Sequence, residues 1–197
     1  MSEAPDPRRE AILESAYKAF ALYGYRRTSM EEIARGTGVS RASLYLQFAN
    51  KEEIFRGLVE RVHQSALDAA ESALEGDAPL ASRLEDALVA KVGRLLDVVS
   101  ESPHGEEIVD ESSRTCGDLV LASSERFQKM LAKAIAGAVR AGELRLTGTG
   151  LSAPAAAELL RLSATGLKYG SADAREYRKR TRQLVRVVLA GFDALGD

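Results

Sequence analysis

The sequence is short of the residues from which disulfides, thiolate metal centres and membrane spans are built. A single cysteine, Cys116, excludes an intramolecular disulfide and a thiolate-based zinc site, and it suits a reducing compartment. No apolar run approaches the roughly 20 residues that a membrane-spanning helix needs, and residues 1–9 contain no apolar signal segment. We therefore expect a cytoplasmic protein.

The chain also lacks a strong excess of charge of either sign. It has 27 basic and 29 acidic residues and a formal net charge of −2, so any surface for an anionic partner must be local. Residues 24–51 include five basic and two acidic residues, a local net charge of +3. This segment is the candidate for contact with nucleic acid.

Period-two runs of β-branched residues are absent, and apolar residues recur at spacings of three and four almost throughout. This pattern predicts an all-α protein, with a length that allows one core or a small head sharing a helix with a larger body. We expect the fourth helix to be long enough to join two subdomains. The predicted helices span 7–22, 28–36, 41–48, 51–74, a segment from about 80 that ends before Pro103, 106–113, 118–140, 154–169 and 175–195.

Residues 28–45 have the anatomy of a helix-turn-helix. Two helices that meet at a steep angle need a small residue at their crossing, which is Ala34, and a residue that accepts positive φ in the turn, which is Gly38. Apolar side chains pin the unit together: Ile33, Val39 and Leu44. The second helix then protrudes and fits a groove about 12 Å wide.

The residues that follow carry a more specific signature. Tyr45, Phe48 and Lys51 have the spacing Tyr-x-x-Phe-x-x-Lys, within the run YLQFANKEEIF that starts at Tyr45. From about Ile12 to Leu58 the chain therefore resembles the Tet-repressor family of transcription regulators. Over the remaining two thirds the resemblance is architectural, in helix number, helix length and the Gly-Glu-Leu-Arg that ends the seventh predicted helix.

The resemblance implies a three-helix DNA-binding head over residues 1–52 and a helical effector-binding and dimerisation body over 53–197. It also implies a homodimeric repressor whose third helices enter the major groove of a palindromic operator. The last two helices of each subunit would form a four-helix interface. An effector bound in a variable pocket of the body would change the spacing of the heads and release the DNA.

Site residues carried over from the resemblance lie around the third helix. The implied phosphate contacts are Thr28, Ser29, Tyr45 and Lys51. Base contacts would fall to Arg41, Ser43 and Gln47, because arginine reads guanine, glutamine reads adenine and serine is permissive. Leu46 departs from the polar or aromatic residue expected there, although an apolar side chain can still touch a thymine methyl. Alternatives remain a core aromatic for Tyr45 and ordinary solvated side chains for Arg41 and Lys51.

The body supplies two further predictions. Small and large apolar residues suited to a symmetric interface occur on the last two helices at Leu159, Leu160, Ser163, Gly166, Leu167, Val185, Val188, Leu189 and Phe192. A pocket for an apolar or amphipathic effector would be lined by Val92, Leu96, Ile108, Phe127, Met130, Leu131 and Leu162, with polar anchors at His63, Arg114 and Tyr169. The alternatives are packing of these faces within the monomer and a filled core without a ligand.

Catalysis finds little support in the sequence. His63, His104, Cys116 and the acids of 106–111 are the best constellation, but the histidines lie on different segments and acids near a helix start are usually solvated. There is no phosphate-cradling glycine loop and no nucleophile elbow. We expect no enzyme, no cofactor and no metal.

Two alternatives stay open. Cys116 is either a redox sensor or a small apolar filler. The protein could also be a helical interaction protein that uses the helix-turn-helix scaffold without binding DNA, although the local charge of +3 argues against that function.

Overall fold

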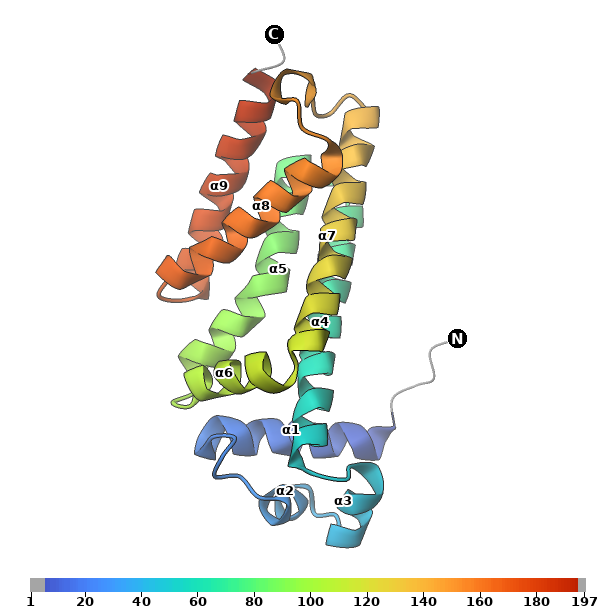
Figure 1. Ribbon diagram of the computed structural model, residues 1–197, viewed down its shortest axis with the longest axis vertical. Coiled ribbons are helices and arrows are strands. Elements are labelled where there is room, and N and C mark those ends of the chain that lie inside the picture. Colours follow the sequence, from blue (N-terminus) through green and yellow to red (C-terminus); the bar gives the residue numbers. More distant parts are fainter. Residues whose placement is uncertain (1–5, 195–197) are drawn as a thin grey trace. The chain divides into compact units, whose positions relative to one another are not determined.

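The computed structural model describes the backbone of residues 6–194 and the side chains of 6–93 and 102–192, and within that range it is all-helical, as predicted (Figure 1). The α-helices are α1 (Pro7–Tyr23), α2 (Met30–Thr37), α3 (Arg41–Gln47), α4 (Lys51–Glu75), α5 (Leu80–Glu101), α6 (Gly105–Thr115), α7 (Gly117–Arg140), α8 (Ala153–Leu167) and α9 (Ala174–Ala194). Short 3-10 turns η1 (Thr147–Thr149) and η2 (Lys168–Gly170) flank α8. The predicted helices are confirmed, with ends that differ by about two residues at most.

Polar side chains and glycines set the helix ends in the first third of the chain. Ser40 caps α3 by accepting from the Ser43 backbone N–H at 3.1 Å, and Asn50 accepts from the Glu53 N–H at the start of α4 at 2.8 Å. Gly38 follows α2 with φ +72°, in the left-handed region that a side chain disfavours. The turn between α2 and α3 is therefore fixed by local sequence, as the helix-turn-helix pattern predicts.

The described chain divides into two compact units, and neither is a continuous stretch. The head unit comprises residues 6–62 and 98–120, and the body unit comprises 63–97 and 121–194. The head unit thus takes in the first half of α4 and all of α6, beyond the predicted boundary after residue 52. The functional division at that boundary stays a prediction.

The core of the head unit explains why the helix-turn-helix holds its shape. Ile33 and Leu44 are fully buried and Val39 is partly buried, so the three predicted pins pack inward. Phe20 and Phe55 lie beside Tyr25 with ring centroids 5.4 and 4.9 Å from it, and 5.7 Å from each other. Such contacts between aromatic rings stabilise the fold beyond the burial of their apolar area. They therefore hold α1, α4 and the segment before α2 in contact.

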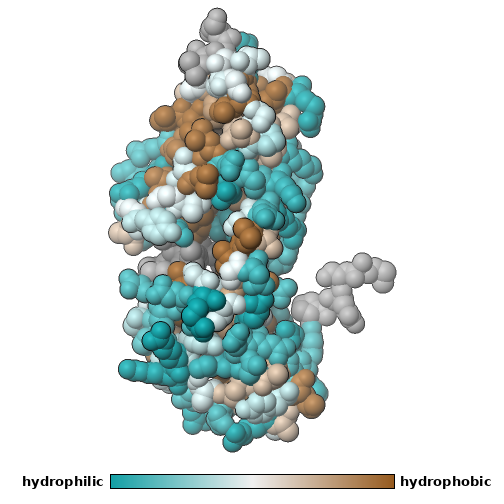
Figure 2. Space-filling view, viewed as in Figure 1, coloured by the Kyte–Doolittle hydropathy of each residue, from teal (hydrophilic) through white to brown (hydrophobic). Residues whose placement is uncertain are grey.

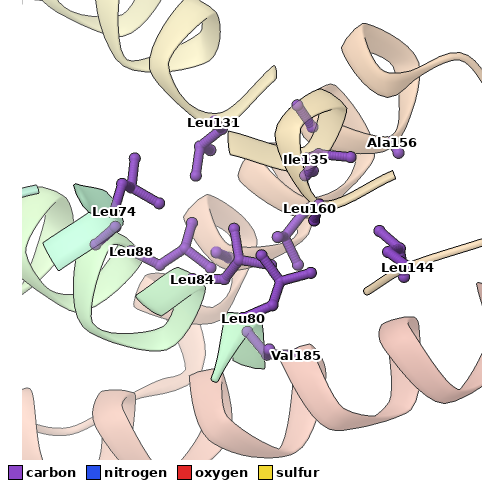
Figure 3. Close-up of a cluster of buried hydrophobic side chains, with 14 of the residues drawn as sticks. Leu74, Leu80, Leu84, Leu88, Leu131, Ile135, Leu144, Ala156, Leu160 and Val185 are labelled. Carbon is purple, nitrogen blue, oxygen red and sulfur yellow. The ribbon is translucent and has the colours of Figure 1, made fainter. Parts of the chain in front are cut away.

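Five helices build the core of the body unit. Side chains from α4, α5, α7, α8 and α9 point toward one another in one apolar cluster (Figure 3). Leu84, Leu88, Leu131 and Ile135 form its fully buried centre. The predicted pocket residues Phe127 and Leu131 belong to this core, as do the predicted interface residues Leu160, Val185 and Phe192.

Candidate functional sites

Helix α3 presents one face to solvent because its other face is pinned. Leu44 and Phe48 are buried, whereas the side chains of Tyr45 and Leu46 are 47% and 86% exposed. Tyr45 is therefore not a core aromatic, and that alternative is wrong. Its phenol is available for the phosphate contact that the resemblance implies.

The predicted base readers lie on or beside this face and have weak internal partners. Arg41 forms an ion pair with Glu31, and both side chains are at least half exposed. The Gln47 Nε2 donates to Asp6 Oδ2 at 3.1 Å, whereas Ser43 is half-buried at the first turn of α3. Exposed ion pairs of this kind contribute about 0–1 kcal/mol. Exchanging such partners for a base edge therefore costs little.

Ser29 serves the start of α2. Its hydroxyl accepts from the Glu32 backbone N–H at 3.3 Å, and the Glu32 carboxylate accepts from the Ser29 N–H at 2.7 Å and from the Ser29 hydroxyl at 2.9 Å. These hydrogen bonds hold the pKa of the Glu32 carboxyl below its usual range. The pair is a capping box, which stabilises the end of α2 that the resemblance places near phosphate.

Two residues carried over as phosphate contacts are instead engaged inside the head unit. Thr28 is 2% exposed, and its hydroxyl donates to the Gly24 carbonyl at 2.8 Å and the Ala19 carbonyl at 3.2 Å. The Lys51 Nζ donates to the carbonyls of Tyr25, Arg26 and Thr28, at 2.7, 3.3 and 2.8 Å. It also lies 4.5 Å from the centre of the Tyr25 ring. All three ammonium donors are thus used, and burial lowers the pKa of Lys51.

The assignment of Thr28 is therefore corrected from phosphate contact to support of the segment between α1 and α2. Lys51 supports the same segment, and its contact with phosphate stays a prediction. Local sequence reasoning could not find this role, because the carbonyls that Lys51 binds lie more than twenty residues before it. The only advance signal was the Tyr-x-x-Phe-x-x-Lys spacing, which places a lysine at the start of α4 without naming its partners.

Replacing Lys51 by methionine is expected to destabilise the head unit. Hydrogen bonds to a charged group contribute about 1.5–3 kcal/mol, so Lys51→Met should lower the free energy of unfolding by about 1–3 kcal/mol. Denaturant unfolding followed by circular dichroism measures the change. Lys18→Met is the control, because Lys18 is exposed in an i,i+4 pair with Glu14. Equal, small effects of the two substitutions would contradict the structural role.

Further basic side chains are exposed in the segment of the head unit that precedes α3. Arg26, Arg27 and Arg35 are exposed. The Arg26 backbone N–H donates to the Glu107 carboxylate of α6 at 2.8 Å, which leaves the Arg26 guanidinium out of that contact. With Lys51 engaged internally, these arginines and Arg41 carry the positive charge that residues 24–51 present to solvent.

The structure does not bring the predicted pocket residues together. Ile108 packs against the core of the head unit, and Arg114 in the same unit pairs with Glu111 at 2.6 Å. In the body unit Leu162 and Tyr169 are exposed. Phe127 and Leu131 are buried in the core, and Met130 and Val92 are partly buried. The side chain of Leu96 lies outside the described residues.

A groove that the sequence did not predict opens on the body unit. It has a volume of about 340 Å³, and its lining comes from α4, α5, α7 and the residues after α7. Leu74, Met130 and Ala134 supply apolar lining, and Glu71, Lys133 and Arg140 are among its charged residues. Met130 alone was predicted for a pocket. Charged residues of both signs near helix ends are typical of a solvated surface, so the sequence pattern did not predict a groove here.

His63 of α4 and Lys91 of α5 form a polar pair inside the body unit. The Lys91 Nζ lies 3.0 Å from the His63 Nδ1, and both side chains are partly buried. Burial, with the neighbouring Lys91 charge, lowers the pKa of His63 to about 4. Burial also lowers the pKa of Lys91 to about 8. Near neutral pH, His63 is therefore neutral, and its Nδ1 accepts a hydrogen bond from the Lys91 ammonium.

Stability should depend on pH through His63. Because its pKa is lower in the folded than in the unfolded state, the unfolded state binds more protons between about pH 6.5 and 4, and the free energy of unfolding falls as the pH falls through this range. From pH 7 to 4.5, wild type should lose about 1–2 kcal/mol more than His63→Gln. Denaturant unfolding at the two pH values measures this difference. Parallel losses in both proteins would contradict the shift.

The predicted interface residues divide between the core and the surface. Leu160, Val185 and Phe192 are buried in their own core, so their assignment to an intersubunit contact is corrected. Ser163, Leu167, Val188 and Leu189 are half-buried and Gly166 is exposed. Leu159 of α8 and Val187 of α9 are 47% and 72% exposed, and Leu162 of α8 is also exposed. Apolar residues gather on the surface over α8 and α9 (Figure 2).

Cys116 is fully buried in the head unit, and burial raises the pKa of its thiol. Thiolate formation is therefore opposed, and the side chain acts as a small apolar filler. Among the described residues no three His, Cys, Asp or Glu side chains are grouped to hold a metal ion. Within the same residues, no helix has the length and apolar character to cross a membrane.

Comparison with known proteins bears on the head unit first. Residues 12–58 match the family "Bacterial regulatory proteins, tetR family", the span over which the resemblance was predicted. This segment of the chain is therefore similar to the tetR family. A curated relative, the uncharacterized HTH-type transcriptional regulator YhgD of Bacillus subtilis, is 32% identical over 42% of this chain and 44% of its own length, so that match spans less than half of the relative.

One further relative and one solved structure extend over the body unit. The HTH-type transcriptional regulator SrpR of Pseudomonas putida is 27% identical over 95% of this chain and 84% of its own length. SmeT, the repressor of the Stenotrophomonas maltophilia multidrug efflux pump SmeDEF, has a solved structure with a TM-score of 0.67 at 23% identity, covering 93% of this chain and 89% of that one. A SmeT–triclosan complex gives a TM-score of 0.66. The structural likeness shows the shared fold.

Proposed function

We propose that this protein is a sequence-specific DNA-binding transcription regulator of the tetR type that acts as a homodimer on a palindromic operator and is released by an effector. The observation that carries the proposal is the exposed face of α3, which is held outward by buried Leu44 and Phe48 and bears Tyr45. The neighbouring exposed arginines supply charge for phosphate. SmeT, which shares the fold, is by name a repressor.

The chemistry of the side chains on this surface suggests separate roles in contacting phosphate and bases. Tyr45 binds backbone phosphate through its phenol, and Arg41 leaves Glu31 to read a guanine. Tyr45→Phe should weaken binding to all DNA sequences about equally, whereas Arg41→Ala should relax the preference at one base pair and cost about 1–3 kcal/mol there. Fluorescence anisotropy with single-base operator variants measures both. Equal loss of base preference from the two substitutions would contradict these roles.

Dimerisation is proposed through the exposed apolar residues of α8 and α9. In an isolated monomer the apolar side chains of Leu159 and Val187 are exposed to water, which is unfavourable. Packing against the same face of a second copy would bury them. The exposed Gly166 permits close approach of helices. Effector release is proposed because a ligand complex of SmeT, the triclosan complex, exists on the same fold.

Enrichment from a randomised DNA pool at two salt concentrations tests the proposed function. A regulator enriches particular sequences, and its affinity for all DNA falls as salt increases because phosphate contacts release counterions. A helical interaction protein that does not bind DNA enriches nothing at either salt concentration. That result would overturn the proposal and favour the alternative function.

A further inference from the structure

The body unit holds a partly buried cation without an anion. Lys91 contacts the neutral acceptor His63, and no carboxylate of the described residues lies within ion-pair distance of its ammonium. Exposed lysines and arginines of the same unit do find acids, as Arg182 does with Glu85 at 3.0 Å. Burying an uncompensated charge costs free energy, so a pair of this kind is not explained by the stability of the fold.

A second polar group is left without a partner on the neighbouring helix. Ser123 of α7 is 6% exposed, and its Oγ has no hydrogen-bond partner among the described residues. A buried hydroxyl without a partner is uncommon and costs about 1–3 kcal/mol. The hydroxyls of Tyr177 and Thr181, one turn apart on α9, are also buried, and burial raises the pKa of Tyr177 to about 12.

Helical periodicity places Ser123 at the same end of the core as the His63–Lys91 pair. The core residues Leu67, Leu88 and Phe127 lie on α4, α5 and α7. His63, Lys91 and Ser123 each lie one turn from the core residue of their own helix, because they are four, three and four positions away in sequence. The Arg126 NH1 donates to the Gln64 Oε1 at 3.0 Å, which shows that α7 runs beside this part of α4.

We propose that Lys91, His63 and Ser123 form the anchor for the carboxylate of a small organic acid, with the adjacent core providing an apolar surface for the rest of that molecule. The inference rests on the proposed function only in taking this acid as the effector. Lys91 supplies the charge, and Ser123 donates a hydrogen bond. His63 holds the ammonium in place by accepting a hydrogen bond from one of its three N–H groups.

This anchor discriminates by charge. A carboxylate pairs with a cation that is already desolvated, so its binding recovers free energy that an uncharged amide of the same shape cannot recover. The structure thus assigns the body unit a preference for an organic acid over its neutral analogue, and the preference depends on Lys91.

The test uses the full chain without DNA and four probes: benzoate, octanoate, benzamide and octanamide. Isothermal calorimetry should show at least one acid bound about tenfold or more tightly than its amide. Lys91→Met should remove this difference, whereas Lys91→Arg should keep it. Lys129→Met, which changes an exposed lysine on α7, is the matched control and should bind like wild type.

Several results would overturn the anchor: no binding of either acid, equal binding of acid and amide, or an undiminished preference in Lys91→Met. Thermal melting without ligand guards against misfolded variants, and Lys91→Met should melt at or above the wild-type temperature because it removes a desolvated charge. A lower melting temperature would mean that Lys91 has an anionic partner in the fold and would also overturn the proposal.

Failure of the proposed function would look different. A protein that prefers the acid but enriches no DNA sequence retains the anchor and loses its role as a regulator. A protein that binds an operator but treats acid and amide alike retains the regulator and loses the anchor.

Discussion

A folded monomer that has lost operator binding is the expected product of Leu159→Asp combined with Val187→Asp. Both side chains are exposed in the single chain, at 47% and 72%, so aspartate is tolerated by the monomer fold. In the proposed dimer the same positions face a second copy, where an unpaired carboxylate costs several kcal/mol. Each head alone reads one half-site, and losing the linkage should reduce operator affinity by about 10²–10⁴-fold.

Light scattering and circular dichroism measure mass and fold of this double variant, and anisotropy measures its affinity for DNA. Leu121→Asp is the matched control, because it changes an exposed leucine of α7 and should leave the dimer intact. A dimeric double variant would contradict the placement of the interface. A wild-type protein that is monomeric at micromolar concentration would contradict dimerisation itself.

Phe55→Ala should unfold most of the head unit under conditions where wild type is stable. Phe55 is buried against Phe20 and Tyr25, and its truncation leaves a cavity where α1 and α4 meet the segment before α2. Truncating a buried phenylalanine costs about 3–5 kcal/mol, a large part of the stability of a domain. DNA binding should fall with it, because the same core positions α3.

Denaturant unfolding followed by circular dichroism measures the effect of Phe55→Ala. Tyr23→Ala is the control, since Tyr23 is a half-exposed aromatic of the same unit and should change the free energy of unfolding by less than about 1 kcal/mol. A loss as small for Phe55→Ala would mean that the aromatic cluster does not hold the head together.

Local chemistry explains what could be predicted from the sequence. Ser40, Asn50 and Gly38 each act within a few residues of themselves, so the start of α3, the start of α4 and the turn were all predictable. The family signature over residues 12–58 was predictable for the same reason, because it is a run of adjacent residues.

Long-range packing explains what could not. Both α8 and α9 carry apolar residues on two faces, so periodicity could not decide that Leu160 and Val185 face the core while Leu159 and Val187 face solvent. That choice depends on where α5 and α7 lie. The pairing of His63 with Lys91 likewise joins residues that are 28 positions apart in the chain, which no local pattern reveals.

The symmetry of the DNA sequence that this protein selects tests its proposed function most directly. Sequencing a randomised pool after rounds of binding should yield a consensus of two half-sites related by a dyad, because a symmetric dimer presents two α3 helices to the major groove. Mass measurement of the complex should give an even number of chains on each site. A pool without a consensus, or a single half-site bound by one chain, would contradict a dimeric regulator of a palindromic operator.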